Sequence, residues 1–246
     1  MENQMNKTAL TGKRVIVLGA SSGLGLATAI AAAAEGAKVV IVSGNQQRIN
    51  EALTRLPAGS EGYAVDLSNE QNIKNFFEQA GYFDHLVYTA GENLTLNKIS
   101  DLVLADAHSF FNLRYWGVLA AIKYGAPYIR EGGSINLTGG IASPRPNTGW
   151  GIAASICGAM EGFTRAMAVE LAPIRVNQVS PGVIRTNLWN SMSAEDRENL
   201  YTSVGEALLL KRVGEAEDIA QTFIYMMKQQ FATGQVITVD GGALLV

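Results

Sequence analysis

The chain has 246 residues, 48% of them hydrophobic, and a formal net charge of -3, which suits one large α/β domain. The charge is too small to indicate a surface for nucleic acid or for an anionic membrane. The single cysteine, Cys157, excludes an intrachain disulfide. No apolar run reaches the ~18 residues of a membrane span, and the polar first ten residues contain no apolar signal core. We therefore expect a cytoplasmic protein.

Short apolar runs alternate with helix-length segments along the whole chain. Seven runs are predicted strands: residues 14–19, 38–44, 61–66, 83–91, 133–140, 174–182 and 234–242. The helix-length segments are about Leu24–Glu35, Gln46–Leu56, Asn69–Gln79, Asp106–Arg130, Gly151–Leu171 and Glu217–Lys228. This alternation predicts an α/β fold, a Rossmann-type doubly wound sheet of seven parallel strands with helices on both faces. We expect a single domain over residues 1–246, of which 1–10 form a flexible tail.

A glycine-rich turn follows the first predicted strand, in "VIVLGASSGLGLATAI". Gly19, Gly23 and Gly25 would let the backbone turn tightly and approach a pyrophosphate, and the next helix would point its N–H groups at that ligand. Strand, loop, helix and second strand follow in order within about 30 residues. The pattern therefore favours dinucleotide binding over an ordinary strand-to-helix turn.

The spacing of these glycines, G-x-x-x-G-x-G, resembles the motif of the short-chain dehydrogenase/reductase family. Further family motifs are matched, in the family's order, by "YAVDLSN", "LVYTAG", "RVNQVSPGVIRT" and "TGQVITVDGG". The resemblance implies an NAD(P)-binding oxidoreductase that acts on a small carbonyl or alcohol compound. The cofactor-binding residues that it implies are Gly19, Ser21, Ser22, Gly23, Leu24, Gly25, Ser43, Gly44, Asn45, Asp66, Leu67, Ala90, Gly91, Pro181, Gly182, Val183 and Thr186.

The end of the second predicted strand bears on which dinucleotide is used. NAD users of the family tend to carry an Asp there, whereas NADP users carry a basic residue there or in the glycine loop. Here the residues are Ser43, Gly44 and Asn45, and the nearest base is Arg48. Because no acid would repel a 2′-phosphate, we expect NADP, with NAD as the alternative. Thr89 stands where the family has an Asn, so we expect fewer hydrogen bonds between strand ends.

The catalytic Ser, Tyr and Lys of the family have no equivalents in this chain, and the preferred alignment replaces the Asn as well. In the family the Tyr passes a proton to or from the substrate oxygen, and the Lys four residues later lowers the Tyr pKa. The segment "EGFTRAMAVELA" aligns the long helix so that the Tyr position is Ala153 and the Lys position is Cys157. The Ser position is Gly140, and the Asn position is Arg114, with Asn112 as the alternative. We therefore assign no catalytic residue.

Four side chains near these positions are candidate substitutes. Arg114 could bind a ligand carboxylate or phosphate bidentately, or it could be a surface or ion-paired residue. Arg145 could add a second positive group or be a solvated loop residue. Cys157 could donate a proton or be a small core residue, and Glu92 could be a base near the nicotinamide or lie on a loop surface.

The predicted substrate pocket consists of Arg114, Gly140, Arg145, Ala153 and Cys157. Neither His85 nor His108 has a partner at metal-ligand spacing, so we predict no metal site. Residues about 186–212 resemble the segment that covers the substrate in the family.

The segments about 106–130 and 151–171 resemble the helices through which family members form tetramers or dimers, so we expect a homo-oligomer. The expected partner is a small molecule, with no nucleic acid and no membrane. Three functions remain open: an oxidoreductase with a non-standard proton transfer, a catalytically silent dinucleotide-binding protein that acts as a sensor or assembly partner, and a non-redox lyase or isomerase on the same scaffold.

Overall fold

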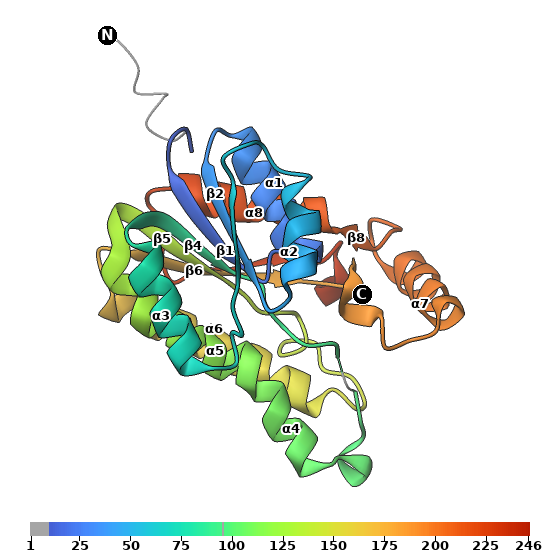
Figure 1. Ribbon diagram of the computed structural model, residues 1–246. Coiled ribbons are helices and arrows are strands. Elements are labelled where there is room, and N and C mark those ends of the chain that lie inside the picture. Colours follow the sequence, from blue (N-terminus) through green and yellow to red (C-terminus); the bar gives the residue numbers. More distant parts are fainter. Residues whose placement is uncertain (1–9, 95) are drawn as a thin grey trace.

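Seven strands form one parallel sheet in the order β3-β2-β1-β4-β5-β6-β9 (Figure 1). The structure is a computed structural model that describes residues 10–94 and 96–246. The strands are β1 (Arg14–Leu18), β2 (Lys38–Ser43), β3 (Glu61–Ala64), β4 (Phe83–Tyr88), β5 (Ile129–Thr138), β6 (Arg175–Pro181) and β9 (Val236–Val239). The predicted Rossmann-type sheet is confirmed, because all seven runs expected to be strands belong to it.

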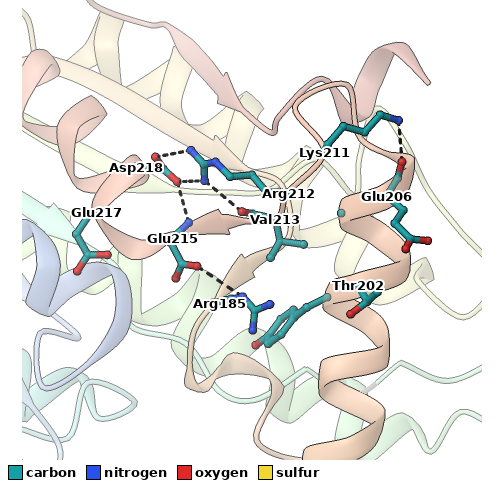
Figure 2. A pocket seen from close by; sticks show the side chains of 11 residues that line it. Arg185, Thr202, Glu206, Lys211, Arg212, Val213, Glu215, Glu217 and Asp218 are labelled. Carbon is teal, nitrogen blue, oxygen red and sulfur yellow. Dashed lines mark hydrogen bonds and ion pairs between the residues drawn. The ribbon is translucent and has the colours of Figure 1, made fainter.

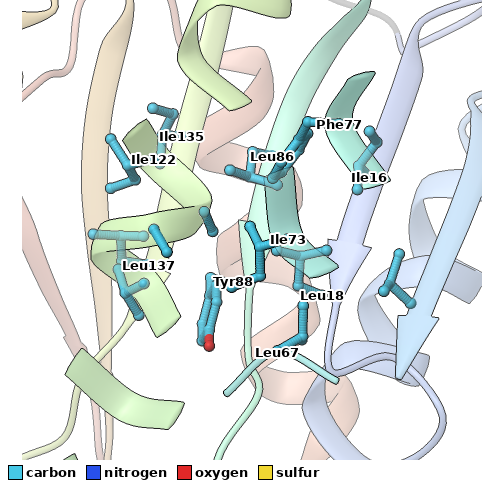
Figure 3. Packing of buried hydrophobic residues seen from close by; sticks show 14 of the residues in the cluster. Ile16, Leu18, Leu67, Ile73, Phe77, Leu86, Tyr88, Ile122, Ile135 and Leu137 are labelled. Carbon is cyan, nitrogen blue, oxygen red and sulfur yellow. The ribbon is translucent and has the colours of Figure 1, made fainter. Parts of the chain in front are cut away.

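Helices cover both faces of this sheet. They are α1 (Gly23–Ala34), α2 (Gln46–Leu53), α3 (Glu70–Ala80), α4 (Leu104–Phe111), α5 (Gly117–Gly125), α6 (Gly151–Glu170), α7 (Ala194–Ala207) and α8 (Ala216–Lys228). Residues of α3, α5 and α6 share one buried cluster with the strands, part of which is drawn in Figure 3. Residues of α1, α2 and α8 form a second cluster on the opposite face. Two cores on one sheet account for strands that are apolar on both sides.

The long helix predicted over about Asp106–Arg130 is confirmed as a helical run from Leu104 to Tyr128, but it contains a π-helical turn that was not predicted. α4 begins at Leu104, a π-helical turn η3 (Asn112–Trp116) separates it from α5, and the short helix η4 (Ala126–Tyr128) leads directly into β5. The Tyr88 hydroxyl donates a hydrogen bond to the Leu113 carbonyl at 2.6 Å. Gly117 allows this contact, because a Cβ there would lie 2.5 Å from the Tyr88 hydroxyl. A strand residue thus helps to hold the π turn.

The segment between β6 and α8 contains elements that we did not predict. The strands β7 (Ile184–Arg185) and β8 (Gly214–Glu215) pair in a separate two-stranded sheet, and the short helix η5 (Asn187–Trp189) precedes α7. Ser193 caps α7 by accepting a hydrogen bond from the Asp196 N–H at 3.1 Å. The expected substrate-covering segment of about 186–212 is therefore mainly helical.

The start of the described chain is already part of the core. The expected tail falls on residues 1–9, which lie outside the described ranges, and on Leu10. Leu10 is only 2% exposed and belongs to the cluster beneath α1, so its assignment to a tail is wrong. In the described ranges, no helix is both long and apolar enough to cross a membrane.

The sheet order reverses direction between β1 and β4. In open parallel sheets, ligands bind beside the carboxyl ends of the strands at such a switch point. Leu18 pairs with Val42 on one side and with Tyr88 on the other, so the loops that follow β1, β2 and β4 emerge side by side. The expected cofactor motifs all follow these strand ends or the ends of β3 and β6.

At the opposite edge, Asp84 joins β4 to its two neighbours. Its carboxylate accepts hydrogen bonds from the Arg14 N–H at 2.8 Å, the Lys13 ammonium at 2.9 Å and the Arg130 guanidinium at 3.3 Å. The side chain is only 7% exposed. Burial raises the pKa of Asp84, but the Arg14 N–H and the Lys13 ammonium more than offset burial, so the pKa lies below its ordinary value of 3.8.

We predict that Asp84→Asn lowers the free energy of unfolding by about 2 kcal/mol at neutral pH, because buried charge-assisted bonds are weakened. The pKa in the folded state is below that of the unfolded chain, so this contribution is present above about pH 4 and is lost as the pH falls through the folded-state value. Urea unfolding at neutral pH and at about pH 3 measures both effects, and the variant should lose less stability on acidification. Glu70→Gln, which removes an exposed pair with Lys123, is the control. Equal stability of Asp84→Asn and wild type at neutral pH contradicts the prediction.

Candidate active site

The turn after β1 lies directly against the end of β4. Gly19 has a positive φ of 87°, and its N–H donates to the Val42 carbonyl at 2.8 Å. A Cβ at this position would lie 2.5 Å from the Ala90 Cα, which is closer than real atoms approach. Gly19 is therefore required by both its backbone conformation and its contact with β4.

Gly25 is restricted by the same strand end. A Cβ there would overlap with the Gly19 carbonyl oxygen and lie 2.5 Å from the Thr89 hydroxyl. The Thr89 hydroxyl donates hydrogen bonds to the Leu18 carbonyl oxygen at 3.0 Å and to the Gly19 carbonyl oxygen at 3.3 Å. The expectation that Thr89 weakens the bonding between strand ends is wrong, because its hydroxyl bridges β4 to β1.

The first turn of α1 presents free backbone N–H groups. Ser22 occupies the N-cap position in an extended conformation and makes no side-chain capping hydrogen bond. An uncapped helix N-terminus carries a partial positive charge and binds anions such as a pyrophosphate. Gly23, with φ of 53°, faces Thr186, whose Cγ2 would lie 3.5 Å from an added Cβ. The structure thus brings the glycine turn and the segment after β6 together.

The ends of β2 and β3 supply polar groups beside this turn. The Ser21 and Ser43 hydroxyls are hydrogen bonded at 2.9 Å. The Asn45 side chain accepts from the Arg48 N–H at 2.9 Å and caps α2. Asp66 accepts from the N–H and the hydroxyl of Ser68, and these hydrogen bonds hold its pKa below the ordinary value.

The expected catalytic positions also meet, but their side chains carry little chemistry. A Cβ on Gly140 would lie 3.2 Å from the Cys157 Sγ, so the family's Ser and Lys positions are adjacent in space. Ala153 is half-buried one turn earlier on α6. Burial raises the pKa of the Cys157 thiol, and the positive charge of Arg114 offsets this only in part. The thiol is therefore held in its neutral form.

A neighbouring pair was missed in the sequence. The fully buried Gln178 of β6 points at Gly139, where a Cβ would lie 2.7 Å from the Gln178 Cδ. Its carbonyl oxygen accepts from the Thr164 hydroxyl at 3.1 Å, whereas its Nε2 has no hydrogen-bond partner among the described residues. The amide occupies the space that a side chain at 139 would need. The sequence did offer one indication of this contact, because Gln178 is a polar residue inside an otherwise apolar strand.

Arg114 and Glu92 form an internal pair beside the catalytic positions. The Arg114 Nε lies 3.6 Å from the Glu92 Oε2, and its Nη2 donates to the Glu92 backbone carbonyl. Burial raises the pKa of Glu92 despite the nearby guanidinium. Arg114 is therefore paired with Glu92 and is not a free surface residue, and neither is Glu92. Asn112, the alternative at the Asn position, is exposed.

Arg145 does not face these residues. Its side chain is exposed, and the guanidinium donates to the Ala243 backbone carbonyl. This contact joins the loop before α6 to the C-terminal turn η6 (Ala243–Leu245). Its predicted place in the substrate pocket therefore lacks support from the geometry.

The two histidines lie outside any cluster of potential metal ligands among the described residues. His85 is buried, and its Nδ1 is hydrogen bonded to the Ser134 hydroxyl at 2.9 Å. Burial lowers the pKa of His85 to about 4, which keeps the ring neutral. Within the described part of the chain, no group of three His, Cys, Asp or Glu residues is placed to hold a metal ion.

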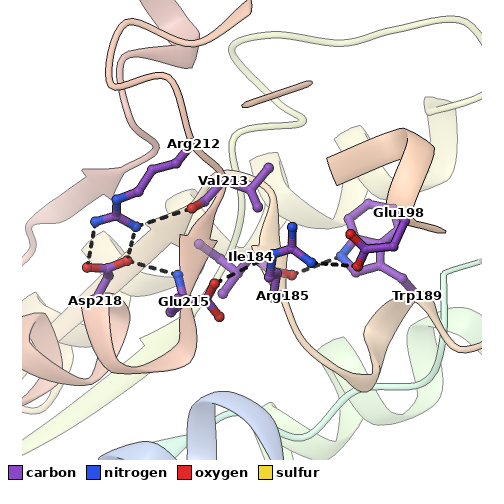
Figure 4. Close-up of polar contacts among 8 residues, drawn as sticks. All are labelled: Ile184, Arg185, Trp189, Glu198, Arg212, Val213, Glu215 and Asp218. Atoms are coloured by element: carbon purple, nitrogen blue, oxygen red, sulfur yellow. Dashed lines mark hydrogen bonds and ion pairs between the residues drawn. The ribbon is translucent and has the colours of Figure 1, made fainter. Parts of the chain in front are cut away.

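A separate cleft of about 690 Å³ lies between α7, the β7–β8 sheet and the start of α8 (Figure 2). Arg185 stacks over the Tyr201 ring at 4.3 Å, bonds Glu198 of α7 at 2.7 Å and lies 3.5 Å from Glu215 of β8. Arg212 binds Asp218 through both terminal nitrogens (Figure 4). The Arg185–Glu198 pair attaches α7 to β7, and the Arg212–Asp218 pair attaches the segment after α7 to α8. The described lining of the cleft includes none of the expected cofactor residues.

Comparison with known proteins agrees with this geometry. A family model described as "Enoyl-(Acyl carrier protein) reductase" matches residues 19–243. The "Short-chain dehydrogenase/reductase ATR9" of Stachybotrys chlorohalonatus is 32% identical over 96% of this chain and 98% of its own length. This chain belongs to the short-chain dehydrogenase/reductase family. The family expected from the motifs, and the oxidoreductase class with it, are confirmed.

Two solved members of the short-chain dehydrogenase/reductase family share the whole fold. One, described as a small-chain dehydrogenase in complex with NADPH, is 36% identical with a TM-score of 0.86, over 96% of this chain and 100% of that chain. The other, "MalC Reductase/Diels-Alderase" from Malbranchea aurantiaca, is 26% identical with a TM-score of 0.89, over 99% of this chain and 100% of that chain. The family is thus one whose members bind NAD(P).

We predict that Gly25→Ala destabilises the protein by at least about 2 kcal/mol, because the added methyl overlaps with backbone that cannot move freely. The same displacement would distort the first turn of α1, so any rise in unfolding temperature caused by NADPH should disappear. Thermal unfolding with and without NADPH measures both effects. Gly162→Ala is the control, because an added Cβ there meets nothing within 4 Å. A Gly25→Ala protein as stable and as responsive as wild type contradicts the prediction.

Proposed function

We propose that this protein is an NADP(H)-binding oxidoreductase that transfers hydride to or from a small carbonyl or alcohol compound without the family's Tyr and Lys. The observation that carries the proposal is the contrast between two halves of one site. The glycine turn, the free N-terminus of α1 and the segment at Thr186 converge as a dinucleotide site requires. The face opposite them carries Gly140, Ala153 and Cys157 instead of acid–base groups.

The residues proposed to hold the cofactor fit its parts. The N–H groups at the start of α1 would receive the pyrophosphate, and Asp66 would lie at the adenine. Ala90, Gly182 and Thr186 would flank the nicotinamide end, which supplies hydride when the cofactor is bound. Ser43 and Asn45 offer hydroxyl and amide groups and no negative charge near the ribose, which supports NADP(H) over NAD(H). The NADPH complex of one relative is consistent with this preference.

Proton transfer must follow a different route from that of the family. A positioned acid or base typically contributes ~10²–10⁴ in rate, so we expect slow turnover unless a solvent molecule or the substrate itself supplies the proton. A second candidate is a non-redox reaction of a bound small molecule, favoured by the loss of acid–base groups. One relative carries the name of a Diels-Alderase as well as of a reductase, which supports this alternative.

The assembly and the covering segment complete the proposal. We propose a homo-oligomer, a dimer or a homotetramer, through the helices α4, α5 and α6. Trp116, the last residue of η3 before α5, is 57% exposed, and Val169, near the end of α6, is 81% exposed, which supports an apolar contact there. Residues 186–212, which Arg185 attaches to the rest of the protein, would cover the substrate. The proposed location is the cytoplasm, and the absence of a membrane-spanning helix in the described ranges is consistent with it.

The first experiment is thermal unfolding with NADP⁺, NADPH, NAD⁺ and NADH. We predict that the NADP pair stabilises the protein by ~2.7 kcal/mol at about 100 times its dissociation constant. Ser43→Asp should weaken NADPH binding at least about tenfold, because a carboxylate repels the 2′-phosphate. Ser100→Asp adds the same charge at an exposed site beside Asp101 and serves as the control. No response to any of the four ligands contradicts the proposal.

The second experiment restores the missing groups. We predict that the triple variant Gly140→Ser, Ala153→Tyr, Cys157→Lys gains weak NADPH-dependent carbonyl reductase activity, because these groups act as a unit. Consumption of NADPH with a panel of aldehydes and ketones measures the gain, and variants with only one of the three changes are the controls. A triple variant that folds and binds NADPH but shows no turnover contradicts the view that only these groups are missing.

A further inference from the structure

Two charged side chains of opposite sign meet where the end of β4 faces the π turn. Glu92 follows the cofactor residues Ala90 and Gly91, and Arg114 is in the middle of η3. The side chains are 37% and 21% exposed, and the Glu92 Oε2 and the Arg114 Nε are the atoms removed from solvent. The neighbouring positions of the site, Gly140, Ala153 and Cys157, contribute no charge.

The backbone is shaped to admit the guanidinium of Arg114. A Cβ on Gly91 would lie 2.7 Å from the Arg114 Cζ and Nη1, so a side chain at 91 would displace the guanidinium from this position. The Arg114 Cζ also lies over the Phe110 ring, 4.8 Å from its centroid. The π turn, bonded to Tyr88, sets the direction of the side chain, and such turns are frequent at functional sites.

The pair is close but poorly satisfied. The Arg114 Nε and the Glu92 Oε2 are buried, 3.6 Å apart, and neither has a hydrogen-bond partner among the described residues. A guanidinium offers five N–H donors, of which one bond, from Nη2 to the Glu92 carbonyl, is formed to the described residues. Leaving a buried charged donor unpaired costs free energy that a better-placed acceptor would recover.

We propose that Arg114 binds the carboxylate of a small-molecule substrate, and that Glu92 occupies its place until the substrate arrives. This inference rests on the proposed function, because it names the substrate class of that site. A planar carboxylate matches the Nε and terminal nitrogens of one guanidinium bidentately. A phosphate would call for further cations, and Arg145, the other cation expected here, is bonded to Ala243 instead.

The test is isothermal titration of the NADPH-loaded protein with acetoacetate and benzoate, each compared with its neutral amide, acetoacetamide and benzamide. We expect at least one carboxylate to bind at least about tenfold more tightly than its amide, because the anion gains charge-assisted bonds to Arg114. Arg114→Met should remove this preference. Glu92→Gln should tighten carboxylate binding about threefold to tenfold, because the internal competitor loses its charge.

Three controls keep the outcomes distinct. The double variant Arg114→Met, Glu92→Gln leaves no unpaired charge, so its loss of carboxylate binding cannot be due to a buried anion. Arg130→Met removes an arginine paired with Asp84 at the other edge of the sheet and should keep carboxylate binding. Inorganic phosphate is titrated in parallel.

Four results would overturn the carboxylate anchor. The first is that carboxylate and amide bind with equal affinity, and the second is that both Arg114 variants still prefer the carboxylate. The third is that no carboxylate binds at about 50 mM, a concentration at which millimolar affinities saturate. The fourth is that only phosphate binds. Titration of NADPH into the same protein is read first. Failure to bind NADPH refutes the proposed function, whereas normal NADPH binding without carboxylate preference refutes only the anchor.

Discussion

No methyl group fits between the turn that follows β1 and the end of β4. The geometry of the candidate site depends on this contact, because it fixes where α1 begins relative to the switch point of the sheet. Gly19 and Gly25 supply the space, and the Thr89 hydroxyl adds hydrogen bonds across it. The free N–H groups of α1 therefore point toward the edge at which β4 and β6 also end.

The same constraint explains why the glycine turn is present although the acid–base groups are absent. The proposed dinucleotide site is built from backbone turns whose conformations are also needed to connect the sheet to α1. The acid–base face is built from side chains on α6 and after β5, whose replacement leaves the sheet unaffected. Gly140, Ala153 and Cys157 fill that face with small groups, and a thiol kept neutral by burial does not replace an ammonium.

The parts of the structure that local patterns determine could be predicted from the sequence, and the parts that distant contacts determine could not. The seven strands were predictable because apolar β-branched runs bounded by turn residues indicate buried parallel strands. The π turn between α4 and α5 was not, since the hydrogen bond between Tyr88 and Leu113 at this turn joins residues that are distant in the sequence. α7 had local signals in its Ser193 cap and the acids that follow, but the segment was interpreted only as a covering loop.

The candidate site divides in the same way. The glycine turn follows from a motif, and the alignment of α6 follows from its flanking residues. The pairing of Arg114 with Glu92 joins residues 22 positions apart through the end of β4. No local pattern indicates that the Arg114 guanidinium lies against Gly91.

The contact between Gly139 and Gln178 makes the effect of one substitution depend on another. A side chain at 139 is blocked while the Gln178 amide lies 2.7 Å from the place of its Cβ. Replacement of Gln178 by a smaller residue alone would leave a cavity beside a glycine. Substitution of either residue alone is therefore unfavourable, and we expect substitutions at the two positions to be tolerated only in combination. A directed-evolution library that samples one position at a time would miss this route, whereas a paired library would contain it.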